Sequence, residues 1–334
     1  MSATMLLPDP VGPLSRRAHA LLRGAHRAPG PLELPEAGSF TEDLDAQLAL
    51  WLIHQLSYRG YDDVDDDLEW SPAVVTLRRG LESAFEAELR SATRERLAVT
   101  DAGTPVEELL LAMVAVDDGP SVAAYLHRHA TREHVLDYLR ERSVQQLAEA
   151  DAQSFMLPRL RGAAKVALAE IQYDEYGAGR ADRLHQDLYA RTMRGAGLDD
   201  SWGAYLPDVG ATSLALANLP SMLALNRRLV PAGAGHFAVF EASSSVPSRK
   251  IAAGIERVGL GPEVAAYFDE HVEADAVHEQ VAARDLCGSL VVERPELRSE
   301  VLFGAACCLH LDRLAAEELL GRWGASDDRA ERAG

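Results

Sequence analysis

Patterns that start helices recur along this chain and do most to limit its fold. Ser39-x2-Glu42 has the spacing of a capping box, and Ser71-Pro72 joins a capping serine to a proline at the first helical position. Further helices are expected to start at Thr104 and Thr131 and to cover about 159–176, 181–194, 213–230, 233–245, 248–258, 262–287 and 297–323. The best β-like run, 289–295, has no partner strand with which to form a sheet. The pattern therefore predicts an all-α fold.

The composition divides the chain into four parts. Residues 1–40 are rich in proline, glycine and alanine, and we expect them to form a loosely ordered arm. A helical N-terminal region over 41–130 follows, then a helical core over 131–325 and a flexible tail over 326–334. The upstream helices are expected to form either a dimer surface or a lid.

The charge and the cysteines exclude several classes of protein. A formal net charge of −19 would repel the phosphates of a nucleic acid and an anionic membrane surface. No apolar run approaches the ~18–20 residues that span a bilayer, and the N-terminus lacks the apolar core of a signal peptide. The three cysteines (287, 307 and 308) suggest no disulfide framework. We expect a cytoplasmic protein without nucleic-acid or membrane partners.

The stretch "YFDEHVEADAVHE" contains His271-x3-Asp275-x2-His278, whose members share one side of a helix. Val264 and Phe268 fall in the same stripe, so the three polar residues interrupt an apolar, inward-facing surface. Burying them is costly unless each is satisfied, and one bound cation would satisfy all three. A surface salt-bridge ladder, or core histidines bonded to carboxylates, is the alternative interpretation.

Isolated acids elsewhere suggest where further ligands would come from. The zinc-hydrolase pattern H-E-x-x-H is absent from the sequence. Iron in a helical bundle would instead take glutamate ligands from several helices. The candidate groups in apolar surroundings are Glu149, Glu170, Glu175, Glu241 and the imidazole of His185. Glu241 stands alone within "FAVFEAS", where an acid is either paired or liganding. Glu170 and Glu175 could equally be surface acids of a helix.

The order of these motifs resembles a known family. "LAEADAQSFMLPRLRGAAKVALAEIQYDEYGAGRADRLHQDLYARTMRGAGLD", then "HFAVFEASSSVPSRKIAAGIERVGL" and "HVEADAVH", are similar to the heme-oxygenase-like diiron oxidases and oxygenases. Within that superfamily the chain resembles the bacterial iron-containing redox enzymes, over roughly residues 140–325. The resemblance implies a heme-oxygenase-like helical bundle, preceded here by an additional helical region.

The resemblance also implies a ligand set for two irons. The matching positions are Glu149, His185, Glu241, His271, Asp275 and His278, with Glu175 at the place of a seventh carboxylate found in N-oxygenating members. Ten helical residues rotate by about 1000°, so Glu175 and His185 would not share a face of one straight helix. Gly177 and Gly179 lie between them and offer the break that is needed.

The expected function is that of an iron-dependent oxidoreductase that activates O2 with two iron ions, or with manganese in their place. N-oxygenation of an amine or an amino-acid derivative is the favoured reaction. The alternatives are oxidative C–C cleavage, desaturation or decarboxylation of an amino or fatty acid. A metal-free heme-oxygenase-like enzyme and a helical binding protein are rivals from other classes. We expect a small-molecule substrate and a homodimer. An external electron donor is compatible with this function.

Overall fold

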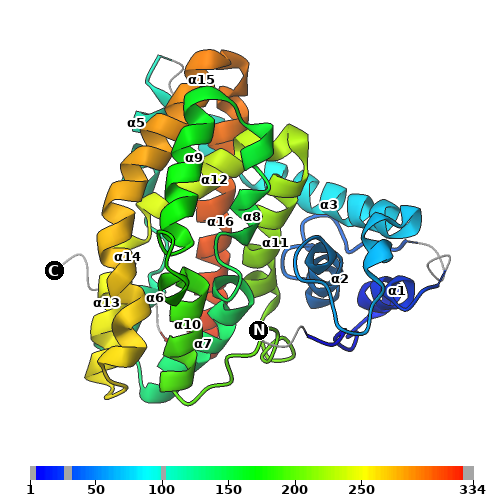
Figure 1. Cartoon of the computed structure of the whole chain (residues 1–334), viewed down its shortest axis with the longest axis horizontal. Helices are drawn as coiled ribbons and strands as arrows, with labels where there is room; N and C mark the ends of the chain where they lie inside the picture. Colours follow the sequence, from blue (N-terminus) through cyan, green and yellow to red (C-terminus); the bar gives the residue numbers. More distant parts are fainter. Residues whose placement is uncertain (1–4, 26–31, 99–102, 326–334) are drawn as a thin grey trace.

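The computed structural model is all-helical over the residues it describes, 5–25, 32–98 and 103–325, with the side chains of 273–276 excepted (Figure 1). The all-α prediction is therefore confirmed. The N-terminal helices are α1 (Pro13–Leu22), α2 (Leu44–His54), α3 (Pro72–Ala92), α4 (Arg94–Ala98), α5 (Val106–Ala115) and α6 (Val122–Arg128). The later ones are α7 (Arg132–Gln146), α8 (Asp151–Ser154), α9 (Gly162–Glu175), α10 (His185–Gly195), α11 (Ala211–Leu225), α12 (Val230–Ala242), α13 (Ser245–Arg257), α14 (Pro262–Gln280), α15 (Ser289–Glu293) and α16 (Arg298–Arg322). The expected tail over 326–334 lies outside the described residues.

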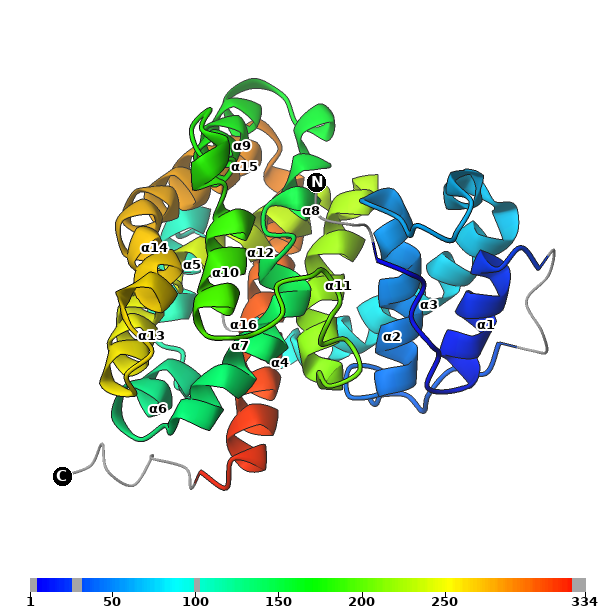
Figure 2. The ribbon, with the colours of Figure 1, turned by 60° about the horizontal axis from the view of Figure 1, so that its bottom comes forward.

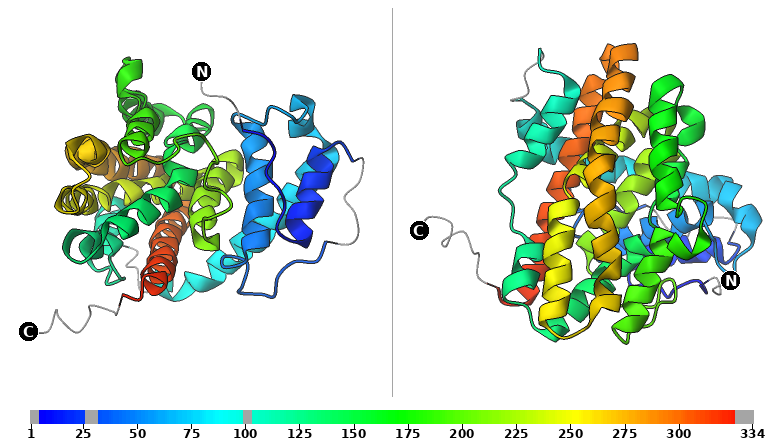
Figure 3. Two further views of the ribbon diagram at one scale, coloured as in Figure 1. Left: turned by 90° about the horizontal axis from the view of Figure 1, so that it is seen from below. Right: turned by 60° about the vertical axis from the view of Figure 1, so that its left-hand side comes forward.

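The long helix α16 forms the centre of the bundle and packs closely along α12 (Figure 1). Glycines allow this approach, because a Cβ at Gly235 would lie 1.8 Å from the carbonyl oxygen of Val301, and one at Gly304 would lie 1.7 Å from that of Ala232. On the outside of the bundle, α14 packs against both α13 and α10 (Figure 3). Helices α9, α10, α12 and α14 thus surround one interior region.

Helices α1, α2 and α3 stand beside the bundle and join it through α11 (Figure 2). Most of α2 is buried, and Trp51 stacks on Trp202 with ring centroids 5.7 Å apart. The upstream region therefore shares one apolar core with the bundle.

Part of the expected loosely ordered arm is a packed helix. Leu14 and Leu21 of α1 are buried, and the backbone amides of Leu14 and Ser15 donate hydrogen bonds to the carboxylate of Asp45 at 2.7 and 2.8 Å. Asp45 thus caps a helix about 30 residues upstream of it. A cap supplied from so far along the chain leaves no local pattern, which is why the proline-rich composition misled the prediction.

Three local features refine or correct the sequence expectations. The β-like run over 289–295, for which no partner strand was found, contains α15, which continues the preceding helical segment and contacts α9. The helical stretch expected over 262–287 is present, with α14 followed by a π-helical segment (η6) over Val281–Gly288. Asp43, and not Ser39, caps α2, by accepting a hydrogen bond from the amide of Ala46 at 2.9 Å.

Among the described helices, none is both long enough and apolar enough to cross a membrane.

Candidate metal centre

The predicted ligands lie on separate elements that meet inside the bundle. Glu149 follows the end of α7, Glu175 ends α9, and His185 begins α10. Glu241 lies near the end of α12, while His271 and His278 lie two helical turns apart on α14. These six side chains form two groups that could each hold a metal ion. The side chain of Asp275, the seventh predicted residue, lies outside the described residues.

The first group consists of Glu149, Glu175, His185 and His271, whose donor atoms all lie within 4.8 Å of one another. Nδ1 of His185 is 3.1 Å from Oε2 of Glu175, and Nε2 of His271 is 3.6 Å from Oε1 of Glu149. The two imidazole rings meet edge to face, with centroids 4.7 Å apart. Two carboxylates and two imidazoles therefore converge on one small volume.

The second group consists of Glu175, Glu241 and His278. Nδ1 of His278 lies 3.3 Å from Oε2 of Glu241 and 3.6 Å from Oε1 of Glu175. All three side chains are at most 5% exposed, so water cannot solvate the charges of the two acids.

Glu175 belongs to both groups and presents one carboxylate oxygen to each. Its Oε2 faces His185, and its Oε1 faces His278. The chain achieves this by ending α9 at Glu175 and starting α10 at His185, with a turn between them that has positive φ at Gly177 and Gly179. A carboxylate placed between two donor groups is the usual bridge of a dinuclear site.

Two imidazole nitrogens show that hydrogen bonds alone do not satisfy these groups. Nδ1 of His185 and Nδ1 of His278 are buried, and neither makes a well-directed hydrogen bond to any described residue. Both nevertheless lie beside carboxylate oxygens. Imidazole nitrogens and carboxylate oxygens that face the same space, with no cysteine among them, suit iron or manganese once the imidazoles are deprotonated. The residues present therefore fit such an ion.

The charges in the centre shift its pKa values in opposite directions. Burial alone would lower the pKa of His278, but Glu241 and Glu175 outweigh it and raise that pKa to about 9. Burial, together with the nearby charge of Glu175, raises the pKa of Glu241. Burial would also raise the pKa of Glu149, yet His271, His185 and Tyr267 lower it overall. Buried carboxylates and imidazoles thus share protons and charge in this centre, and a bound cation would take the place of those protons.

Two residues that the sequence did not single out hold the ligands in place. The hydroxyl of Tyr267 donates to the Glu149 carboxylate, at 2.8 Å from either oxygen, and the Tyr267 carbonyl accepts from Nδ1 of His271 at 2.7 Å. Oδ2 of Asp174 lies 3.3 Å from Nε2 of His278. Tyr267 is four residues before His271, a spacing that could have revealed it, whereas Asp174 gave no signal beyond its place next to Glu175.

Glu170, the remaining candidate acid, is exposed on α9 and belongs to neither group. Glu170 is therefore a surface acid of the helix and not a member of the candidate metal centre.

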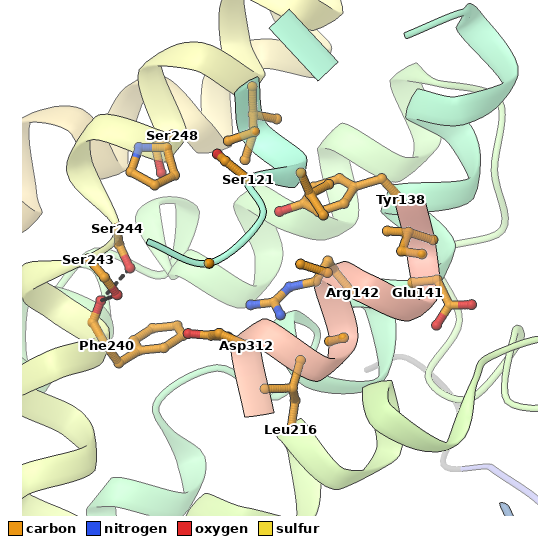
Figure 4. Close-up of a pocket in the computed structure, with 18 of the residues that line it drawn as sticks. Ser121, Tyr138, Glu141, Arg142, Leu216, Phe240, Ser243, Ser244, Ser248 and Asp312 are labelled. Carbon is orange, nitrogen blue, oxygen red and sulfur yellow. Dashed lines mark hydrogen bonds between the residues drawn. The ribbon is translucent and has the colours of Figure 1, made fainter. Parts of the chain in front are cut away.

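A cavity of about 500 Å³ adjoins the first group, and Glu149, Tyr267 and His271 form part of its wall. Phe240, Ser243 and Ser244 from the end of α12 line it as well (Figure 4). The volume lies within the range of small-molecule sites.

The all-α bundle and its buried carboxylate–imidazole groups define a helical protein with a candidate metal centre. The model of the family described as "Iron-containing redox enzyme" matches residues 136–313, more than half of the chain. The chain belongs to this heme-oxygenase-like family, as the motifs suggested, and it is an iron-dependent oxidoreductase. No curated protein matches it.

Proposed function

We propose that this protein is a non-heme diiron enzyme that uses O2 to oxidise a small amine, such as an amino-acid derivative, at nitrogen. The observation that carries the proposal is the shared carboxylate of Glu175, which presents one oxygen to each donor group. Two ferrous ions bound there would supply the electrons and the open coordination positions that O2 reduction needs.

The donors divide naturally between two ions. Glu149, His185 and His271 would hold the first, and Glu241 and His278 the second, with Glu175 between them. Asp275, from the same helix as both α14 histidines, stays a predicted additional ligand.

The protein around the donor groups keeps the ligands oriented. Tyr267 holds the Glu149 carboxylate and fixes the ring of His271, so that Nε2 of His271 turns toward the first group. Asp174 does the same for His278, whose Nδ1 then faces the second group. Such outer hydrogen bonds keep a donor set in place before the metal arrives.

N-oxygenation sets a definite electron balance. One atom of O2 forms a bond to the substrate nitrogen, which becomes a hydroxylamine. The other atom is reduced to water with two protons and two electrons. An external donor, such as one reduced flavin or two reduced ferredoxins, must supply those two electrons in each turnover.

Anaerobic loading with Fe(II) tests the diiron centre. We expect two irons per chain by metal analysis and a transient visible absorption on mixing with O2. His278→Ala should reduce the iron content, whereas Glu170→Gln, on the exposed side of α9, should leave it unchanged. Fewer than one iron per wild-type chain, or no loss in His278→Ala, would refute the diiron proposal.

The reaction itself can be tested with candidate amines under heavy-isotope O2. Incorporation of one labelled oxygen atom at nitrogen, seen by mass spectrometry, is the expected result. A cleaved or desaturated product without labelled nitrogen would instead support the lyase-type or desaturase-type reactions. Manganese-loaded protein, run in parallel, decides which metal is active.

A further inference from the structure

Arg142 projects from α7 into the cavity beside the metal centre. Figure 4 shows its guanidinium group pointing toward Phe240, while the neighbouring carboxylate of Glu141 points away. Tyr138, Arg142 and Gln146 are spaced by four residues and follow one face of α7 toward Glu149, so they form a continuous wall of the cavity.

Two other charged side chains on the cavity wall, Arg322 and Glu318, are satisfied by the protein itself. Arg322 pairs with Glu141 at 2.6 Å and with Asp137 at 3.2 Å. Glu318 accepts a hydrogen bond from the hydroxyl of Thr212 at 2.6 Å. These groups have little need of a ligand.

Arg142 differs from them. No described residue forms an ion pair or a hydrogen bond with its guanidinium, and its Nε is buried. Asp312 also lines the cavity, and the charge of Arg142 acts to lower its pKa, against the effect of burial. The two side chains nevertheless lie too far apart to form an ion pair. The sulfur of Cys308, 3.7 Å away, is the hydrogen-bonding neighbour of the Asp312 carboxylate. A cation in such a position is costly unless something in the cavity pairs with it.

The position of Arg142 relative to the metal centre suggests what that partner is. Glu149 stands seven positions after Arg142, and the helical part of this interval, from Arg142 to Gln146, corresponds to roughly 6 Å along α7. A ligand with an anionic head at Arg142 could therefore extend to the wall formed by Glu149 and His271. The planar guanidinium fork matches a carboxylate, to which it can donate two parallel hydrogen bonds.

We propose that Arg142 binds the carboxylate of the substrate and directs its far end to the metal centre. The inference rests on the proposed function for the chemistry at that far end, and it specifies the substrate class as a small carboxylic acid. An α-amino acid and a simple aliphatic acid both carry this head. Asp312 and the hydroxyls of Ser243 and Ser244 offer acceptors for an additional ammonium group.

Calorimetric titration with three probes of equal chain length tests the proposal, on both the metal-free and the anaerobic iron-loaded full-length protein. The probes are octanoate, its uncharged isostere octanamide, and 2-aminooctanoate. We expect both carboxylates to bind in either metal state and octanamide to bind much more weakly. Tighter binding of 2-aminooctanoate than of octanoate assigns the site to amino acids, and the reverse order assigns it to aliphatic acids.

Arg142→Gln should weaken carboxylate binding on the order of 10- to 100-fold, with little effect on octanamide. Arg142→Lys keeps the charge but loses the two-pronged geometry, and should give an intermediate affinity. Arg284→Gln, an exposed arginine paired with Asp285 outside the cavity, is the matched control and should bind like the wild type.

Three results would overturn the proposal. These are equal affinity for octanoate and octanamide, carboxylate binding that requires iron and ignores Arg142→Gln, and no saturable carboxylate binding by the wild type. Iron content is measured on the same samples. A variant with a normal iron content and weak carboxylate binding fits the inference, whereas a wild type that fails to load iron refutes the diiron function and leaves the test on metal-free protein standing.

Discussion

Two buried clusters of histidine and glutamate lie in different parts of this molecule, and only one of them fits a metal. In the upstream region, Nε2 of His54 contacts Glu82 and Nδ1 contacts Asn218, each at 3.1 Å. Asn226 donates to the other oxygen of Glu82 at 3.0 Å. In the metal centre, by contrast, Nδ1 of His185 and of His278 have no well-directed hydrogen bond to a described residue.

Residue type and burial are therefore the same in the two clusters, and the hydrogen bonds differ. The upstream cluster is closed, because protein groups occupy both imidazole nitrogens and both carboxylate oxygens. The metal centre is open, because its nitrogens and oxygens face a common space. The upstream cluster accordingly ties α2 and α3 to α11, whereas the other retains the capacity to bind a cation.

The largest effect is expected from the carboxylate shared by both donor groups. Glu175→Gln should reduce the iron content from two per chain to nearly none, because each ion loses a charged ligand. Glu241→Gln alters the second group only and should retain about one iron. Metal analysis after anaerobic loading measures both. Equal iron contents in the two variants would contradict the assignment of Glu175 as a bridge.

Disruption of the closed cluster should lower the stability of the fold and leave the metal content unchanged. Glu82→Ala leaves His54 and Asn226 without their acceptor, and loss of one partner from a buried pair costs about 3 kcal/mol or more in the free energy of unfolding. Denaturant unfolding of the metal-free protein measures this cost, and iron loading of the folded variant should equal that of the wild type. Lost iron with unchanged stability would reverse the roles of the two clusters.

His236 is buried outside both clusters, has no hydrogen bond or ion pair to a described residue, and gives a pH dependence. Burial lowers the pKa of His236 to about 4 from the ordinary 6.5, so the folded state favours the neutral ring. The free energy of unfolding therefore has its full value above pH 6.5, where the ring is neutral in both states. As the pH falls toward 4, it decreases by about 3 kcal/mol. His236→Leu should flatten the dependence of unfolding free energy on pH in this window. His127→Gln, on the surface, should leave it unchanged.

The smallest effect is expected from the hydrogen bonds behind the ligands. Tyr267→Phe removes the donor to Glu149 and should weaken iron binding about tenfold, as is usual for the outer partners of a metal ligand. Tyr189→Phe is the control, because its hydroxyl donates to the carbonyl of Leu139, and the two rings lie 4.9 Å apart. Competition with a chelator of known affinity measures both variants. Equal weakening in the two would assign the effect to packing.

Local patterns predicted the helices well where the signals were local. Ser71-Pro72 and Thr131 stand at the starts of α3 and α7. The start of α1, which Asp45 caps from a distance, and the π-helical segment escaped prediction. No period in the sequence encodes either one.

The candidate site was predictable in its members and not in its arrangement. Six predicted side chains converge, but the sequence could not show that Glu175 faces both groups, since this depends on where α9 stops. Arg142 was missed for a related reason. Its spacing on α7 is ordinary, and its importance comes from the absence of a charged partner in three dimensions.

The turn between α9 and α10 has a consequence for how this protein can vary. A Cβ at Gly177 would lie 2.3 Å from the carbonyl oxygen of Arg180 and 2.9 Å from the amide nitrogen of Leu184, and its φ is +78°. Any other residue there must displace the backbone of the turn. That displacement changes the distance between Glu175 and His185. The geometry of the candidate metal centre thus depends on a position that contributes no ligand and has no side chain, and random mutagenesis should find it among the least tolerant sites.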